Sequence, residues 1–220
     1  MEVFPLAVNV YFVRHGQTYL NLFHKYQGWS DAPLTEKGIE DGKRVGKALA
    51  KIDFDYLFCS DMRRTVKTAE LLAASHPTKI VHPEPDPAFR EVFFGFFEGE
   101  DTAAASMNIG LCRSYDELVS KYSVEKARDI TKAADPFHLA ENDAEFWQRM
   151  DKGLDRLRNL PDGSTAVVVS HGAAIRSIVS RYAKDKTLAN DAPVNGSITK
   201  LSLTPDQTKI VFYNQLSLPE

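Results

Sequence analysis

Two stretches decide the fold, NVYFVRHGQT (residues 9–18) and TAVVVSHGAA (residues 165–174), because each is an apolar run that stops at His-Gly. The runs are β-branched or aromatic and lack polar alternation, so both are predicted to be central strands covered on both faces. Two imidazoles at the ends of such strands, about 156 residues apart in the sequence, indicate a common destination in the folded protein.

The remaining segments alternate between strand-like and helix-like patterns. A helix is predicted over residues 34–52, with Thr35 as its N-cap. Its glycines recur every four residues, and we expect this narrow stripe, formed by Gly38, Gly42 and Gly46, to face the sheet. Other predicted strands are residues 56–60, 79–81, 197–204 and 209–214, and other predicted helices follow residues 60 and 171 and include residues 146–157.

Strands that alternate with helices indicate an α/β fold with a mostly parallel sheet. We therefore predict a three-layer sandwich with helices on both faces of the central sheet. Residues 100–142 have mixed charge and weak periodicity, and they are predicted to be an inserted cap segment. The whole chain, residues 1–220, is predicted to form one domain.

Composition restricts the class of protein. The 220 residues carry a formal net charge of −3, which gives no basic surface for nucleic acid. The two cysteines form no metal-ligand pattern, so we expect a reducing compartment and no metal site. No run has the length or the flanks of a membrane span or a signal peptide, so we expect a cytoplasmic protein without a membrane partner.

Several charged side chains follow the predicted strands. In open α/β sheets, ligands bind outside the carboxyl ends of the strands. Arg14 and His15 stand at the end of the first strand-like run, and His171 at the end of a later one. Arg63 and Arg64 follow the run between them, and we expect Arg64 to be the one that joins the site.

The expected site is suited to bind an oxyanion, because it combines two imidazoles, guanidiniums and a helix N-terminus. Gly16 and Gly172 leave room for a ligand near the backbone, and the helix after His171 is expected to offer free N–H groups to the anion. Arginine suits phosphate because its guanidinium donates two parallel hydrogen bonds. Neighbouring positive charge also keeps a histidine in the neutral form that a nucleophile needs.

Five segments resemble the motifs of the histidine phosphatase superfamily, also called phosphoglycerate-mutase-like, and they occur in the family's order. They are RHGQTYLN (14–21), QGWSDAPLTEKG (27–38), SDMRRTVKTA (60–69), REVFFGFFEG (90–99) and VVVSHG (167–172). The resemblance covers residues 10–99 and 143–180, about three fifths of the chain. It implies phosphoryl transfer through a phosphohistidine, without a metal or another cofactor.

The resemblance also implies a role for each matched residue. His15 matches the nucleophile, and Arg14 and Arg64 match arginines that hold the phosphate. His171 matches the second histidine, which contacts the transferring phosphoryl group. Glu91 matches the carboxyl group that protonates the leaving oxygen.

Other matched positions are predicted to line the phosphate end of the site. These are Asn21, Gln27, Gly28 and Gly172. One departure from the family pattern is Gln17, which stands where glutamate is commoner, and this change removes no catalytic group.

The predicted activity is hydrolysis of a small phosphorylated substrate, a phosphomonoester. The alternative is a phosphoglycerate mutase that uses the same nucleophile and also grips a substrate carboxylate. Mutases carry an arginine pair before Ser-Tyr in a longer insertion, whereas CRSYDE (112–117) has Arg113 alone. A non-catalytic phospho-ligand module is disfavoured because no expected catalytic residue is missing. The substrate and the oligomeric state stay open, a homodimer being one option.

Overall fold

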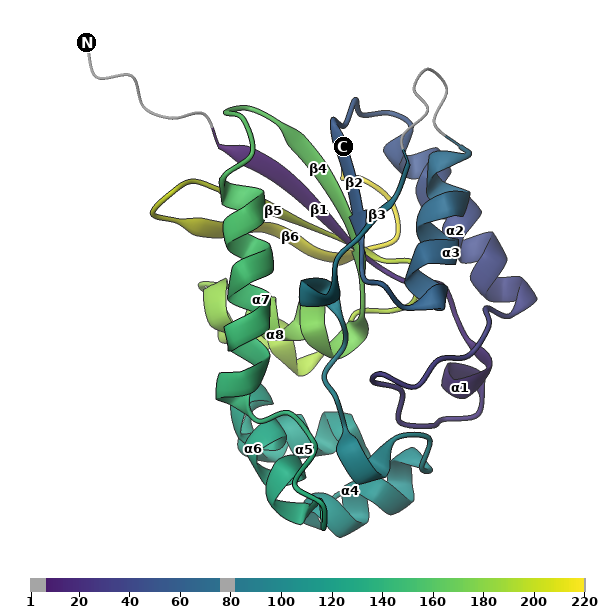
Figure 1. Ribbon diagram of the computed structural model, residues 1–220, viewed down its shortest axis with the longest axis vertical. Coiled ribbons are helices and arrows are strands. Elements are labelled where there is room, and N and C mark those ends of the chain that lie inside the picture. Colours follow the sequence, from purple (N-terminus) through teal and green to yellow (C-terminus); the bar gives the residue numbers. More distant parts are fainter. Residues whose placement is uncertain (1–6, 76–81, 220) are drawn as a thin grey trace.

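The computed structural model describes residues 7–75 and 82–219, and it confirms the predicted α/β fold (Figure 1). The six strands of the sheet are β1 (Val8–Arg14), β2 (Tyr56–Cys59), β3 (Glu84–Pro85), β4 (Thr165–Ser170), β5 (Ile198–Leu203) and β6 (Thr208–Gln215). Their spatial order is β3-β2-β4-β1-β5-β6. The first four strands in that order are parallel, whereas β5 and β6 form an antiparallel hairpin at the edge. The predicted strand at residues 79–81 lies outside the described residues.

The helices lie on both faces of this sheet, as predicted. They are α1 (Tyr19–Leu22), α2 (Glu36–Leu49), α3 (Arg63–Ala73), α4 (Thr102–Gly110), α5 (Tyr115–Tyr122), α6 (Val124–Ala134), α7 (Asp143–Arg158) and α8 (Gly172–Tyr182). Short 3₁₀ turns occupy Pro87–Phe89, Gly95–Phe97 and Lys186–Asn190. No helix within the described ranges is long and apolar enough to cross a membrane.

Successive side chains along each central strand point to opposite faces of the sheet, so they belong to two different hydrophobic cores. Val13 and Val169 are fully buried on the face covered by α2 and α3. Phe12 and Val168 are fully buried on the opposite face, against α7 and α8. Burying an apolar side chain of this size stabilises the fold by about 1.5–3 kcal/mol. The all-apolar runs of the sequence thus form the two-sided centre of the sheet.

The register of β1 and β4 brings the two His-Gly sequences together. These strands are direct parallel neighbours, with Val13 opposite Val169 and Arg14 opposite Ser170. The backbone N–H of His15 donates to the carbonyl oxygen of Ser170 at 3.0 Å. Because each histidine follows the last residue of its strand, the two imidazoles leave the sheet at the same edge.

The glycines of α2 face a different neighbour from the one that the sequence predicted. Thr35 is the N-cap, as predicted, and accepts from the backbone N–H of Gly38. A Cβ atom at Gly42 would lie 3.0 Å from Leu71 of α3, and one at Gly46 would also meet α3. Gly42 and Gly46 therefore pack against a neighbouring helix and Gly38 against the backbone of Gln17, not against the sheet, because the sheet face of α2 is formed by larger apolar side chains.

The predicted cap segment, residues 100–142, contains α4, α5 and α6. Figure 1 shows these helices grouped at one end of the molecule, beyond the lower ends of α7 and α8. Each helix begins with a side-chain cap, from Asp101, Ser114 and Ser123 respectively. The segment faces the edge of the sheet at which the histidines emerge, because Thr102 and Tyr115 line a cavity there together with Arg14.

Candidate active site

The two imidazoles that follow β1 and β4 lie against each other. The ring centroids of His15 and His171 are 5.2 Å apart, and the rings meet edge to face at 67°. Both side chains are buried, with exposed fractions of 3% for His15 and 0% for His171. The sequence predicted that folding brings these two rings together, and the structure places them side by side.

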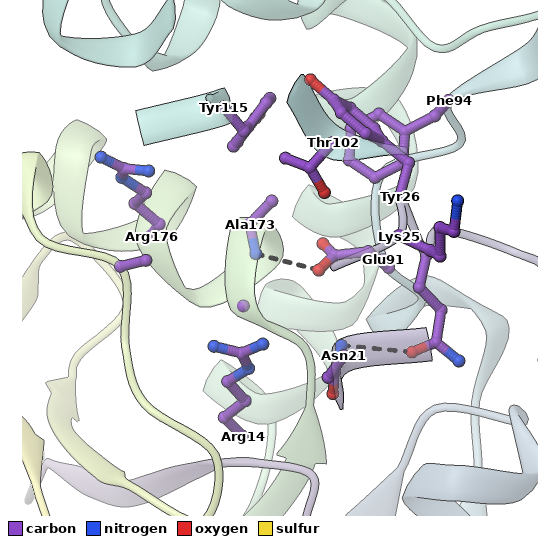
Figure 2. Close-up of a pocket in the computed structure, with 13 residues that line it drawn as sticks. Arg14, Asn21, Lys25, Tyr26, Glu91, Phe94, Thr102, Tyr115, Ala173 and Arg176 are labelled. Atoms are coloured by element: carbon purple, nitrogen blue, oxygen red, sulfur yellow. Dashed lines mark hydrogen bonds between the residues drawn. The ribbon is translucent and has the colours of Figure 1, made fainter. Parts of the chain in front are cut away.

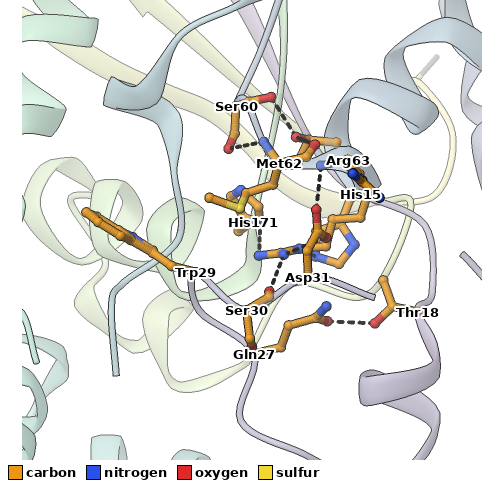
Figure 3. Close-up of polar contacts among 12 residues, drawn as sticks. His15, Thr18, Gln27, Trp29, Ser30, Asp31, Ser60, Met62, Arg63 and His171 are labelled. Carbon is orange, nitrogen blue, oxygen red and sulfur yellow. Dashed lines mark hydrogen bonds and ion pairs between the residues drawn. The ribbon is translucent and has the colours of Figure 1, made fainter. Parts of the chain in front are cut away.

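Arg64, in the first turn of α3, joins the two histidines. Its Nε donates to Nε2 of His15 at 3.3 Å, and a terminal nitrogen contacts Nδ1 of His171 at 3.0 Å (Figure 3). The guanidinium is held from the other side by the carbonyl oxygens of Gly28 and Ser30 and by the carboxylate of Asp31. Arg64 is 1% exposed, whereas the neighbouring Arg63 is exposed, so the structure separates the ambiguous pair.

Hydrogen-bond partners assign the tautomer of each histidine. Nδ1 of His15 lies 2.8 Å from the carbonyl oxygen of Gly16, which only accepts, so Nδ1 carries the hydrogen and Nε2 carries the lone pair. Nδ1 of His171 faces the guanidinium of Arg64, which only donates, so the hydrogen of His171 is on Nε2. The site thus holds one nucleophilic nitrogen and one N–H donor.

Electrostatics keep both imidazoles neutral. Burial, and after it the positive charge of Arg64, holds the pKa of His15 well below its usual value, and Arg14 lowers it further. Burial and Arg64 lower the pKa of His171 in the same way. Neutral His15 has the lone pair on Nε2 that attack on phosphorus requires.

Three buried donors around these rings have no hydrogen-bond partner within the described residues. They are Nε of Arg14, Nε2 of Gln27 and Nε2 of His171. Arg14 also donates to the carbonyl oxygen of Pro193, which fixes its guanidinium beside the cavity (Figure 2). Buried donors in a folded protein are nearly always paired. These three unpaired donors come from separate segments of the chain, and together they are complementary to a small oxyanion.

Glu91 occupies the start of α8. Its carboxylate accepts from the backbone N–H groups of Ala173 at 2.9 Å and Ala174 at 2.8 Å, and from that of Val92 at 3.0 Å. Burial raises the pKa of Glu91, although these backbone donors and Arg64 oppose the shift. Two of the N–H groups that the sequence predicted to face the anion are therefore taken by the side chain of Glu91.

The predicted polar loop residues form one network near His15. Nδ2 of Asn21 donates to Oε1 of Gln27 at 3.3 Å, and the hydroxyl of Thr18 donates to the same oxygen at 2.6 Å. That arrangement leaves the Nε2 of Gln27 pointing away as a free donor. The structure therefore places Gln27 with a donor available for a ligand, and Asn21 as a residue that orients it.

The predicted glycines act through close packing. A Cβ at Gly28 would lie 2.2 Å from the carbonyl oxygen of Val92, and the Gly28 carbonyl accepts from Arg64. A Cβ at Gly172 would lie 3.2 Å from Cζ of Arg14. Gly172 thus lets the guanidinium of Arg14 lie flat beside the start of α8, and Gly28 lets its loop reach Arg64.

Two positioning residues escaped the sequence prediction. Asn195 donates from Nδ2 to the carbonyl oxygen of His15 at 3.0 Å and to Oδ1 of Asn21 at 3.2 Å. Arg149 of α7 donates to the carbonyl oxygens of Arg90 and Glu91 at 2.8 and 2.7 Å. Asn-Gly at 195–196 signals only a turn, and Arg149 resembles any other arginine on an amphipathic helix, so neither carried a usable signal.

The site opens into a cavity between the edge of the sheet and the cap segment. It has a volume of about 170 Å³, and its lining includes Arg14, Asn21 and Glu91, which Figure 2 labels, together with Gln27. Within the described part of the chain, no three His, Cys, Asp or Glu side chains are grouped so that they could hold a metal ion. The lining is suited to a phosphate ester of small size.

Comparisons with known proteins agree with this geometry. The family model of the histidine phosphatase superfamily (branch 1) matches residues 10–216. The probable phosphoglycerate mutase GpmB of Erwinia tasmaniensis is 33% identical over 174 residues, which cover 79% of this chain and 74% of that protein. The crystal structure of phosphoglycerate mutase from Bacillus anthracis has a TM-score of 0.86 at 29% identity, covering 96% of this chain and 95% of that one.

More distant structures show the same fold. The mycobacterial glucosyl-3-phosphoglycerate phosphatase has a TM-score of 0.74 at 21% identity, covering 94% of this chain and 98% of that one. The alpha-ribazole phosphatase from Shigella flexneri has a TM-score of 0.73 at 20% identity, covering 96% and 98%. Both likenesses concern the fold alone.

Proposed function

The chain belongs to the histidine phosphatase superfamily, and on that premise we propose that it is a phosphatase that hydrolyses small phosphomonoesters through a phosphohistidine on His15. The observation that carries this proposal is the lone pair of His15 Nε2 beside buried donors that have no partner in the described residues. No metal is required in this proposal, because the two guanidiniums of Arg14 and Arg64 supply positive charge to the phosphate.

In the first step, Nε2 of His15 attacks phosphorus in line with the bond to the leaving oxygen. The N–P bond forms as the P–O bond breaks, and protonated Glu91 gives its proton to the leaving oxygen. Arg14, Arg64 and the N–H of His171 donate to the equatorial oxygens. Each preorganised donor of this kind is commonly worth about 3 kcal/mol of barrier.

In the second step, water attacks the phosphohistidine. The carboxylate of Glu91 accepts a proton from the water, the new P–O bond forms, and the electron pair of the N–P bond returns to His15. Inorganic phosphate then leaves. The raised pKa of buried Glu91 supports both halves of this cycle, because the group can hold and release a proton nearer to neutral pH.

The second candidate function is phosphoglycerate mutase activity, which the names of the relatives favour. A mutase returns the phosphoryl group to another hydroxyl of a carboxylated substrate. Arg113, which stands where the mutases carry an arginine pair, is exposed and does not line the cavity. This position supports the phosphatase proposal over the mutase. A non-catalytic phospho-ligand module is disfavoured because His15 and Glu91 are both in place.

The test compares wild type, His15→Ala and His82→Ala with p-nitrophenyl phosphate and with 3-phosphoglycerate. His82 is an exposed histidine outside the site and serves as the matched control. We expect wild type and His82→Ala to hydrolyse p-nitrophenyl phosphate, with or without EDTA, and His15→Ala to be inactive. Hydrolysis that survives in His15→Ala would refute the nucleophile. Isomerisation of 3-phosphoglycerate well above its hydrolysis would establish the mutase instead, and loss of activity in EDTA would require a metal.

A further inference from the structure

The end of the cavity away from Arg14 is lined by three aromatic rings of the loop after α1, the loop after Glu91 and α5. Tyr26, Phe94 and Tyr115 meet one another edge to face, with ring centroids 4.7 Å apart for Tyr26 and Phe94 and 5.7 Å apart for Phe94 and Tyr115. Figure 2 shows these rings beyond Glu91 as seen from Arg14. Because Glu91 is placed to protonate the leaving oxygen, this end of the cavity receives the alcohol part of the ester.

The cationic side chains at this end are unsuited to a substrate carboxylate. Within residues 7–75 and 82–219, the cations that line the cavity are Arg14, Lys25 and Arg176. The charge of Arg176 is already paired, because its Nη1 donates to the carboxylate of Asp116 at 2.6 Å, while its Nε and Nη2 donate to the carbonyl oxygens of Ala189 and Asn190.

Lys25 lies at the rim of the cavity, with a side chain that is 35% exposed and 4.0 Å from Asp101. An exposed ion pair of this kind contributes little binding energy. Apart from Arg14, which is assigned to the phosphate, the described lining therefore offers apolar ring surface to the alcohol and no buried cation that lacks a carboxylate partner.

One polar group at this end lacks a partner. The hydroxyl of Tyr115 is shielded from solvent and makes no hydrogen bond with any described residue. The hydroxyl of Tyr26, in contrast, is paired with that of Ser106 at 3.0 Å. A buried hydroxyl left unpaired costs free energy, so Tyr115 is placed to meet a polar atom of a ligand.

Building on the proposed function, we infer that the site selects phosphate esters of an uncharged alcohol that bears an aromatic ring. The ring packs against Phe94 and its neighbours, and a hydrogen-bonding atom on it meets the hydroxyl of Tyr115. A carboxylated alcohol such as phosphoglycerate is disfavoured, because its charge loses hydration without gaining a cation.

The experiment measures binding of phosphonates, which keep a C–P bond and are not hydrolysed. Titration calorimetry compares benzylphosphonate, pyridin-3-ylmethylphosphonate and 2-carboxyethylphosphonate with wild type, Phe94→Leu, Tyr115→Phe and Tyr122→Phe. Tyr122 is the matched control, because it lies on the same helix and its hydroxyl donates to the carbonyl of Gly110, outside the cavity. Because nothing is turned over, this result is independent of whether the chain is a phosphatase.

We expect wild type to bind benzylphosphonate at least about tenfold more tightly than 2-carboxyethylphosphonate. Phe94→Leu should weaken benzylphosphonate about threefold or more. Tyr115→Phe should weaken the pyridine compound about tenfold and leave benzylphosphonate nearly unchanged. Equal or tighter binding of the carboxylated compound by wild type would overturn the inference, and so would the same loss in Tyr122→Phe as in Tyr115→Phe. Hydrolysis that survives in His15→Ala, or no hydrolysis by wild type, in the earlier test would overturn only the phosphatase proposal.

Discussion

Nε of Arg64 donates to Nε2 of His15 across 3.3 Å, a contact that joins the start of α3 to the end of β1. The bond is long, and it occupies the lone pair that is proposed to attack phosphorus. An arriving phosphate offers oxygens to which the guanidinium can donate more strongly. In the proposed mechanism, this contact therefore holds the lone pair of His15 at rest, and the guanidinium turns to the phosphate oxygens when substrate binds.

Arg64→Ala should lower kcat by about 10²–10³-fold, because it removes a donor to the phosphate and a charge that, after burial, lowers the pKa of both histidines. Arg64→Lys should recover little, since an ammonium lacks the planar fork that reaches two rings and a loop. Arg63→Ala is the matched control, because this adjacent arginine is exposed, and its rate should stay within about twofold of wild type. Steady-state kinetics with p-nitrophenyl phosphate measure kcat for wild type and the three variants. Equal losses at both positions would show that net charge matters and not the contacts of Arg64.

Glu91→Gln should lower kcat for benzyl phosphate by about 10²–10⁴-fold, because an alkoxide needs a proton in order to leave. The loss with p-nitrophenyl phosphate should be much smaller in the first step, since nitrophenolate is stable without protonation. Burial raises the pKa of Glu91, so the wild-type rate with benzyl phosphate should fall as pH rises through that pKa. The variant should lack this alkaline limb. The first step is measured as the rate of alcohol or nitrophenolate release in the first turnover, and a similar loss of that rate with both substrates at every pH would assign Glu91 a structural role.

The free energy of unfolding should decrease as pH falls below about 6.5. Burial and Arg64 hold the pKa of folded His15 and His171 well below that of the unfolded chain. Below pH 6.5 the unfolded chain therefore binds protons that the folded chain does not, and stability is lost on the way down to the folded pKa. Urea titrations at several pH values for wild type and His15→Asn should show a shallower pH dependence in the variant. Glu91 has the opposite effect but is present in both proteins. Identical pH dependence would mean that His15 is not held neutral by the fold.

Gly16→Ala should destabilise the protein by about 3 kcal/mol. A Cβ there would lie 2.1 Å from the carbonyl oxygen of Gly38, which is backbone and moves only with α2. Gly42→Ala should be nearly neutral, because its Cβ meets the end of the Leu71 side chain at 3.0 Å and alanine favours helix by about 1 kcal/mol over glycine. Chemical denaturation of the two variants tests the difference. A mild effect at Gly16 would show that the first turn of α2 is free to shift.

The fold was predictable where local pattern and burial agree. The runs that end at His15 and His171 are apolar on both faces, and only the centre of a sheet covered on both sides accommodates them. Thr35 was predictable as a cap because an N-cap is decided within one helical turn. The glycine stripe of α2 was assigned to the wrong neighbour, because periodicity shows that one face is narrow and does not show which element lies against it.

The sequence by itself determined the central strands, the long amphipathic helices and the types of residue that stand at the carboxyl ends of those strands. Only the tertiary structure decided that Arg64 contacts both histidines, that Glu91 takes two N–H groups of α8, and that Asn195 donates to the carbonyl oxygen of His15. Hydrophobic periodicity is a short-range signal that depends on a few consecutive residues. These contacts join residues far apart in the chain, and they exist only when the register of parallel strands brings their loops to one edge.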